Sequence, residues 1–158
     1  MCFRPGPEPC EPKIVAAIDN ARSSLLVQAY GFTDRGIISA IDRAHARDLP
    51  VRVLLDKENR SSRYGGLADL QDHDVPVRID DRVAIAHNKV IVIDGERVIG
   101  GSYNYSSAAE KKNAENVTLI DSACVADAFT ENFDARWAAS APVAGIARDA
   151  ERSDRRSR

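Results

Sequence analysis

The sequence predicts an α/β sandwich. Segments whose apolar residues recur three and four positions apart, as in helices, alternate along the chain with short apolar runs typical of buried strands. A length of 158 residues with 44% apolar residues is enough for one sizeable core and short for two domains. We therefore expect a single domain over residues 1–141, followed by a disordered, arginine-rich tail over residues 142–158, where the apolar pattern ends.

Two pairs of a helix and a strand account for the first part of the chain. Apolar residues at helical spacing begin at Ile14, and the run that starts at Ser24 has the character of a buried strand. Thr33 and Asp34 each carry a side-chain oxygen that can cap a second helix. The expected elements are a helix over 14–21, a strand over 24–30, a helix with its apolar stripe over 37–44, and a strand over 51–55.

The second part of the chain is expected to be richer in strands. Residues 56–66 place basic side chains among serines and glycines, which indicates a surface loop. Asp94-Gly95 is a strong signal for a tight hairpin. The last helix repeats an apolar or aromatic residue at every fourth position, a stripe that we expect in the core. The expected elements are a short helix over 67–72, strands over 75–79, 89–93, 97–100 and 117–120, and a helix carrying Val125, Phe129, Phe133 and Trp137.

One segment carries residues with catalytic potential, and it begins at His87. Residues two apart on a strand share a face, so His87 and Lys89 are expected to project together into one site. The hairpin then reverses the chain and returns Ser102 and Asn104 to the same place. Gly101 and the glycine before it leave room for the oxygens of a ligand to approach the backbone.

These residue types suit a phosphodiester. Lys89 offers a positive charge, and the amide of Asn104 and the hydroxyl of Ser102 offer hydrogen-bond donors, to the non-bridging oxygens of a phosphoryl transition state. His87 is the strong nucleophile of the group, so we expect it to attack phosphorus and form a phosphohistidine. Glu115 would hold the imidazole in position through its other ring nitrogen.

The pattern His87-x-Lys89-(x)4-Asp94-(x)6-Gly101-Ser102-x-Asn104 resembles the HKD signature of the phospholipase D superfamily, with six fixed positions in 18 residues. The segments 28–33, 55–57 and 114–116 further resemble the small, single-motif bacterial endonucleases of the Nuc type, and the resemblance covers residues 2–139. The resemblance implies a phospholipase-D-like sandwich, in which a mixed, mostly β-sheet is flanked by helices on both faces. It also implies a mainly structural role for Asp94. Gly31 departs from the pattern, in which a serine is expected.

The presence of one motif predicts a homodimer. Transfer through a phosphohistidine needs a nucleophile and a separate acid that protonates the leaving oxygen, and the motif holds a single histidine, His87. The resemblance is to members of the superfamily that dimerise. A two-fold axis beside His87 would supply the partner subunit's His87 as general acid and then as general base.

The substrate that the resemblance favours is nucleic acid, which means DNA or RNA cleaved without sequence specificity. The formal charge of −2 does not mark a nucleic-acid binder by bulk electrostatics, so any phosphate affinity is expected to be local. Lys57, Arg60 and the backbone of Gly101 are the candidate phosphate contacts. Four aromatic residues are candidates for stacking on bases at the rim, although they suit packing in the core equally well: Tyr30, Phe32, Tyr103 and Tyr105.

Two other functions stay open. One is a phospholipase D-type hydrolase of phospholipids, since a lipid headgroup presents the same diester; the chain shows no amphipathic helix that would favour stable membrane association. The other is a catalytically silent module that binds nucleic acid. No cofactor is expected.

A metal-dependent nuclease is a rival to the histidine mechanism. Carboxylates around a turn have the right donor atoms for Mg²⁺, but they show no defined ligand spacing, and we expect no metal site. The other two histidines suit structural roles, His45 at a helix end and His73 in a turn. The rival ligands are Asp72, His73, Asp74, Asp80 and Asp81.

Cys2 and Cys10 flank a proline-rich turn that would bring their sulfurs together. They are either a disulfide or two free thiols, and a zinc site lacks nearby partners. A disulfide, combined with an export signal removed ahead of this chain, would imply a periplasmic or secreted protein. Cys124 is expected to be a small buried residue.

Overall fold

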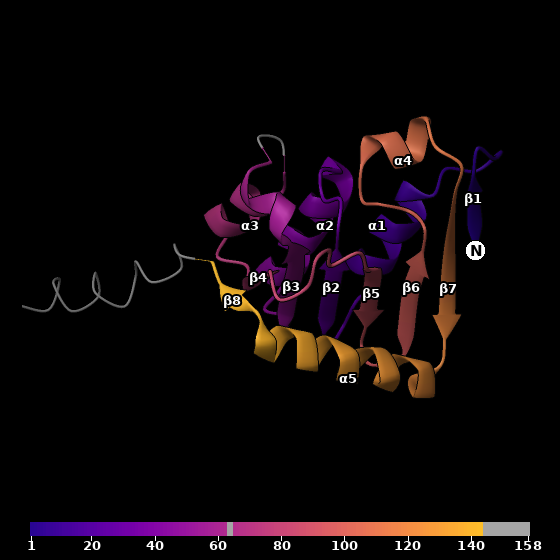
Figure 1. The fold of residues 1–158 in the computed structure, drawn as a ribbon. Coiled ribbons are helices and arrows are strands. Elements are labelled where there is room, and N and C mark those ends of the chain that lie inside the picture. The colour runs from indigo at the N-terminus through magenta and orange to yellow at the C-terminus, as the bar shows by residue number, and fades with distance from the viewer. Residues whose placement is uncertain (63–64, 144–158) are drawn as a thin grey trace, which may run out of the picture.

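A computed structural model describes residues 1–62 and 65–143 of the protein. Its centre is one mixed sheet with the strand order β1-β7-β6-β5-β2-β3-β4-β8 (Figure 1). Strand β2 is parallel to β3, and β3 to β4, whereas the other neighbouring pairs are antiparallel. This confirms the predicted fold class.

The strands are β1 (Cys2–Arg4), β2 (Leu25–Ala29), β3 (Val51–Asp56), β4 (Val77–Asp80), β5 (Lys89–Ile93), β6 (Arg97–Gly101), β7 (Glu115–Asp121) and β8 (Ala141–Pro142). The helices are α1 (Glu11–Asp19), α2 (Arg35–Ala46), the 3-10 helix η1 (Lys57–Arg60), α3 (Leu67–Asp72), α4 (Ser107–Lys111) and α5 (Ala123–Ala139). The side chain of Asp34 caps α2 by accepting a hydrogen bond from the amide of Ile37.

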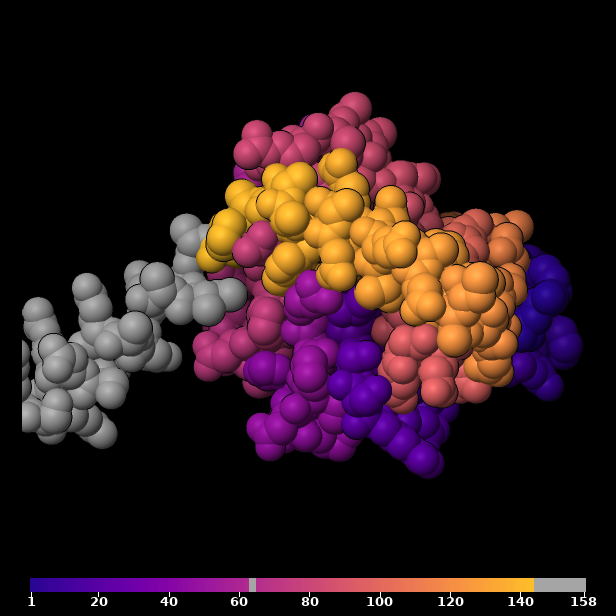
Figure 2. All heavy atoms as spheres, turned by 90° about the horizontal axis from the view of Figure 1, so that it is seen from below, coloured from indigo at the N-terminus to yellow at the C-terminus, as the bar shows by residue number. Residues whose placement is uncertain are grey.

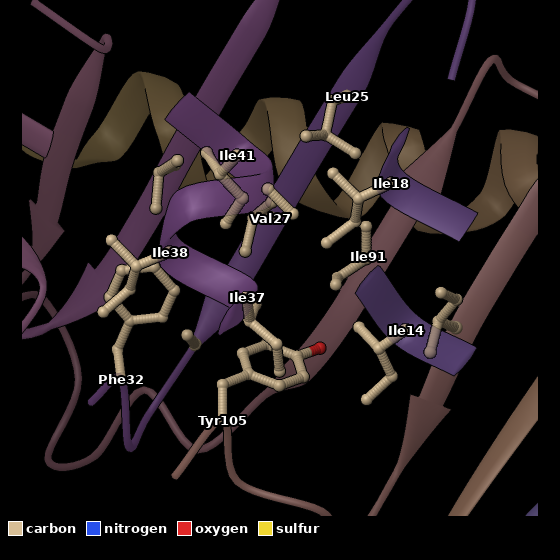
Figure 3. Packing of buried hydrophobic residues seen from close by; sticks show 14 of the residues in the cluster. Ile14, Ile18, Leu25, Val27, Phe32, Ile37, Ile38, Ile41, Ile91 and Tyr105 are labelled. Carbon is tan, nitrogen blue, oxygen red and sulfur yellow. The ribbon is translucent and has the colours of Figure 1, made fainter. Parts of the chain in front are cut away.

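Helices cover both faces of the sheet. Helices α1 and α2 lie on one face, and α5 runs across the other, as the view from below shows (Figures 1 and 2). The larger part of the core lies under α1 and α2, where isoleucines of both helices meet β2 and β5 (Figure 3). On the opposite face Phe133 of α5 packs with Leu26 of β2 and Val92 of β5. Both faces of the central strands are therefore buried, which explains their continuous apolar runs.

The hairpin between β5 and β6 forms where the sequence predicts it. Asp94 and Gly95 both have positive φ angles, 58° and 67°, as a type I′ turn requires. This turn fixes the register in which Ile91 pairs with Ile99. It therefore determines which residues of β6 return to the start of β5.

The N-terminal strand was not predicted from the sequence. Strand β1 pairs with β7, with Phe3 opposite Asn116. Cys2 and Cys10 form a disulfide that connects β1 to the start of α1, which decides between the alternatives left open above. In the described residues both sulfurs are thus used, and neither is a free thiol or a metal ligand.

Two further details differ from the predictions. Cys124 is exposed in the first turn of α5, so the expectation that it is buried is wrong. In this turn Ala126 is the buried residue, and it belongs to the core cluster between α5 and the sheet. The sheet also extends to Pro142, which pairs with Arg78 of β4. Most of the predicted tail, residues 144–158, lies outside the described residues.

Candidate active site

The residues singled out from the sequence meet at one edge of the sheet, the upper edge in Figure 1. Strands β2, β3 and β6 end at this edge, and β5 and β7 begin there. The strand order therefore brings together residues that lie far apart in the sequence. These are Tyr30 after β2, Asp56 on β3, Lys89 on β5, Gly101 on β6 and Glu115 on β7.

His87 is exposed two residues before β5, and Lys89 is the buried first residue of that strand. The Nζ atom of Lys89 donates a hydrogen bond to the backbone oxygen of His87 at 2.8 Å. Burial lowers the pKa of the Lys89 ammonium, and the negative charge of Glu115 acts in the opposite direction. A cation is thus held against the backbone of His87, in surroundings that screen its charge less than water does.

Tyr30 forms one wall beside the imidazole. Its ring centroid lies 4.7 Å from that of His87, at an interplanar angle of 61°. The Nζ atom of Lys89 lies 5.3 Å from the same ring centroid. The Tyr30 hydroxyl donates to Glu58 at 2.9 Å, and this hydrogen bond, with burial, raises the pKa of Tyr30. The tyrosine therefore stays a neutral aromatic surface next to both groups.

The loop that precedes His87 is held by Asp56, a fully buried carboxylate at the end of β3. One oxygen of Asp56 accepts a hydrogen bond from the amide of Ala86 at 2.6 Å, and the other accepts from the amide of Glu58 at 2.9 Å. In the sequence, Asp56 stands within a segment that resembles the family, and no role was expected for it. A carboxylate that directly ends a buried apolar strand was the available signal, because such a group needs partners.

Gly101 and Ser102 form the opposite side of the site. Gly101 has a φ of +140°, and a Cβ there would lie 2.3 Å from the backbone oxygen of Asn116, so only glycine fits. The Ser102 hydroxyl donates to the Glu115 carboxylate and accepts a hydrogen bond from the amide of Asn116 at 3.1 Å. Glu115 also accepts from Asn113 at 2.9 Å. Within one chain, Glu115 thus positions Ser102, and the expected contact with the His87 imidazole is not formed.

Asn104 lies against Gly31. The side-chain oxygen of Asn104 accepts a weak hydrogen bond from the Gly31 amide at 3.4 Å. A Cβ at position 31 would lie 3.2 Å from Cβ of Asn104, a tight contact. The glycine that departs from the expected serine therefore gives Asn104 additional room.

Three of the four aromatic residues proposed for base stacking belong to the core. Phe32 is 0% exposed, and Tyr103 and Tyr105 are also buried. The expectation that Phe32 lines the rim is wrong, because its ring packs under α2 beside Ile38 (Figure 3). Tyr30 alone of the four keeps an accessible face.

Two of the three predicted phosphate contacts, Lys57 and Arg60, lie on η1, close to the loop before His87. Both side chains are exposed. Lys57 donates to the backbone oxygen of Val83 at 3.3 Å, and Arg60 forms an ion pair with Asp81 at 3.0 Å. Lys57 therefore keeps most of its donors for a ligand, whereas the charge of Arg60 is partly neutralised.

Asp94 lies at the far end of β5 from His87. Its carboxylate accepts hydrogen bonds from the backbone amides of Arg22, Ser23 and Ser24, at distances between 2.7 and 3.1 Å. Burial opposes ionisation of this carboxyl, but the hydrogen bonds outweigh it and lower its pKa. These contacts tie the hairpin to the start of β2 and leave Asp94 away from the reacting groups.

Three of the five rival metal ligands form ion pairs with other side chains. Asp80 pairs with Arg136, Asp81 with Arg60, and His73 with Asp42. Across residues 1–62 and 65–143, no three side chains of the types that bind metals gather in one place. His45 belongs to the last turn of α2 and His73 follows α3, both on elements other than those that build the site.

The arrangement as a whole suits attack on a phosphorus atom. The exposed His87 has the Nζ atom of the buried Lys89 against its backbone oxygen, and Ser102 and Asn104 follow the end of β6 at the same edge. These groups come from β5 with the loop before it and from the segment after β6, and the sheet holds their relative positions.

Known proteins match this chain over most of its length. The family model described as "Cardiolipin synthase, PLD-like domain" matches residues 14–137. A "Phospholipase D" of Rickettsia bellii is 44% identical over 137 residues, which cover 87% of this chain and 68% of the relative. A "Mitochondrial cardiolipin hydrolase" of Xenopus laevis is 26% identical and is covered to 65%. The chain thus spans about two thirds of the length of these curated relatives.

Solved structures also match this chain over most of its length. Nuc from Salmonella typhimurium, a phospholipase D family member, superimposes with a TM-score of 0.83 at 30% identity, covering 89% of this chain and 94% of Nuc. NucT from Helicobacter pylori superimposes with a TM-score of 0.76 at 22% identity, covering 84% of this chain and 89% of NucT. The second likeness concerns the fold alone.

Proposed function

The chain belongs to the phospholipase D superfamily of phosphodiesterases, and from that premise we propose that it is a metal-independent, non-specific endonuclease of DNA, with RNA as an alternative substrate. The observation that carries the proposal is the mutual coverage with Nuc, in which each chain covers about nine tenths of the other.

His87 is the proposed nucleophile. A neutral ring nitrogen of His87 attacks phosphorus, a nitrogen–phosphorus bond forms, and the bond to the leaving oxygen breaks. Lys89 and the side-chain amide of Asn104 stabilise the charge on the non-bridging oxygens during this step, whereas the Ser102 hydroxyl donates its one hydrogen to Glu115. Glu115 supports the reaction indirectly, by holding the Ser102 hydroxyl.

The partner subunit's His87 is the proposed acid. In its protonated form it gives a proton to the leaving oxygen, and in its neutral form it then takes a proton from water. The water oxygen attacks phosphorus, the nitrogen–phosphorus bond breaks, and a phosphate monoester leaves. One chain holds one such histidine, so the site is complete only in a homodimer.

Support for pairing at this edge comes from the loop before His87. It reads Val83-Ala84-Ile85-Ala86, and Ile85 is 55% exposed. An apolar segment that borders a polar site and stays open to solvent in one chain is typical of a surface covered by a partner. A two-fold axis through this segment would place two imidazoles on opposite sides of a bound phosphate.

Nucleic acid is the proposed substrate because the site is open and has cations at its margin. Lys57 and Arg60 are exposed on η1, next to the loop that leads to His87. Cations of this kind bind phosphates without distinguishing bases, so cleavage is expected to be non-specific. Tyr30 provides one ring on which a base can stack.

A second candidate substrate is a phospholipid, because curated relatives carry the names "Phospholipase D" and "Mitochondrial cardiolipin hydrolase". In the described part of the chain, the helices are too short or too polar to traverse a bilayer.

The test incubates the purified protein in EDTA with plasmid DNA, single-stranded DNA, RNA and phosphatidylcholine vesicles, in parallel with the His87→Ala variant. Cleavage of plasmid and single-stranded DNA by the wild type alone is the expected result. Release of choline without cleavage of nucleic acid would replace the nuclease proposal with the phospholipase. Equal activity of the variant would reject His87 as the nucleophile.

A further inference from the structure

Glu110 is a buried carboxylate that the proposed chemistry does not use. It lies on α4 and is 7% exposed. Burying an ionised carboxylate is costly unless several donors surround it, and Glu110 has them on two sides. One set of donors comes from the N-terminal segment and the other from the catalytic edge.

The N-terminal donors belong to residues held by the disulfide. The amides of Cys10 and Glu11 each donate to the Glu110 carboxylate at 3.1 Å. The guanidinium of Arg4 lies 3.2 Å from the same carboxylate and donates to the Glu110 backbone oxygen at 2.7 Å. Because the disulfide joins Cys2 to Cys10, it fixes both β1, which carries Arg4, and the first turn of α1. These residues precede the region that the family model matches, which begins at residue 14.

The donor on the catalytic side is Tyr103. Its hydroxyl donates to Glu110 at 2.9 Å, and the tyrosine is 2% exposed. Burial, with the hydrogen bond to Glu110, raises the pKa of Tyr103, so the hydroxyl keeps its proton and stays a donor. In the sequence, Tyr103 stands between Ser102 and Asn104. A shift of its ring would move both neighbours.

We propose that Glu110 is a positioning residue, which anchors Tyr103 to the disulfide-closed N-terminal segment and thereby places Ser102 and Asn104 for phosphoryl transfer. Breaking the Cys2–Cys10 bond loosens the donors on one side of Glu110, and turnover falls as the segment 102–104 loses its position. The inference rests on the proposed phosphodiesterase site, whichever natural diester occupies it.

The test uses bis(4-nitrophenyl) phosphate, a small diester that needs no contacts beyond the site. Tyr103→Phe removes one hydroxyl and leaves the other partners of Glu110 in place. Glu110→Gln removes the charge and keeps the shape. We expect both to lower kcat by about ten-fold with KM little changed, because a small displacement of catalytic groups reduces turnover by such factors. The matched control is Asp34→Asn, which alters a buried carboxylate that caps α2, and it is expected to keep the wild-type kcat.

The disulfide is tested in a Cys124→Ser background, in which Cys2 and Cys10 are the only remaining cysteines. Circular dichroism and thermal melting confirm that the reduced protein is folded at the assay temperature. Reduction is expected to lower kcat to the level of Tyr103→Phe, and to cause no further loss when applied to Tyr103→Phe, because both changes act through one contact.

The amides of Asn104 and Tyr105 provide a readout of position that is independent of turnover. Their hydrogen exchange is expected to accelerate in both variants and on reduction, whereas the exchange in β2 stays slow. Folded variants and reduced protein with wild-type kcat would overturn the positioning role, and so would a change confined to KM. A wild type that fails to cleave the diester at all would instead reject the proposed function itself.

Discussion

The ring of Tyr30 lies edge-on to the imidazole of His87, with 4.7 Å between the ring centroids. The same ring faces the ammonium of Lys89. Contacts of this kind are each worth about 0.5–1.5 kcal/mol, enough to favour one rotamer of an exposed histidine. The orientation of His87, the proposed nucleophile, therefore depends on a residue outside the pattern of six residues that begins at His87.

The first prediction follows from this contact. Tyr30→Ala should lower kcat for a small diester by about ten-fold, because the imidazole gains rotational freedom. Tyr30→Phe keeps the ring and loses only the hydrogen bond to Glu58, so its kcat should stay close to that of the wild type. Steady-state kinetics of the two variants separates the roles. Equal losses in both would assign the effect to the hydroxyl and not to the ring.

The second prediction concerns Asp94, which acts on stability and not on chemistry. Asp94→Asn should lower the free energy of unfolding by about 1–3 kcal/mol, since backbone amides lose a charged acceptor. The pKa of Asp94 is lower in the folded state than its ordinary value of 3.8, so its contribution to stability is present above that value and is lost as pH falls through the folded pKa. Urea denaturation between neutral and acidic pH should therefore show a difference between wild type and variant that shrinks in acid. A variant that is stable but inactive would place Asp94 in the chemistry.

The part of the candidate site that depends on local strand geometry could be predicted from the sequence. His87 and Lys89 lie two residues apart, and a two-residue turn at Asp94 fixes where β6 returns, so alternation and turn type were enough to bring Ser102 to the same edge.

The features that could not be predicted from the sequence depend on contacts between residues far apart along the chain. Glu110 contacts Cys10 and Arg4 across about a hundred positions, and Asp56 contacts Ala86 across 30. The burial of Phe32 likewise depends on how α2 lies on the sheet. Periodicity shows which face of a helix or strand is apolar. It does not show which polar side chains of other helices and strands contact that element.

The third prediction concerns the balance of charge around Lys89. Burial lowers its pKa below the ordinary value of 10.5, and the charge of Glu115 opposes that shift. Glu115→Gln removes the opposing charge, so the pKa of Lys89 should fall further and a smaller fraction should be protonated at alkaline pH. The chain has five lysines, so NMR titration of isotope-labelled lysine side chains resolves them one by one. An unchanged or raised titration midpoint for Lys89 in the variant would show that Glu115 does not act on it.

The fourth prediction is that turnover does not depend on a metal ion. In the proposed mechanism, Lys89 and the side-chain amide of Asn104 supply the positive charge and the donor that a cation would otherwise provide to the non-bridging oxygens. Activity on plasmid DNA should be unchanged after dialysis against EDTA and should not rise when magnesium is added. Loss of cleavage in EDTA that magnesium restores would reject the histidine mechanism.

The last prediction follows from the number of histidines in the site. Two-step transfer needs a nucleophile and an acid on opposite sides of phosphorus, and each chain supplies one His87, so both must come from a dimer. A heterodimer of wild-type and His87→Ala chains then holds one of the two and should turn over poorly. When an excess of mutant chain is mixed with wild type and the subunits exchange, activity should fall below the value expected from dilution alone. Differently tagged chains verify the exchange, and His87→Ala homodimers verify that the variant still pairs. If exchanged heterodimers keep about half of the wild-type activity, each subunit works alone, because independent sites would lose only the mutant's share.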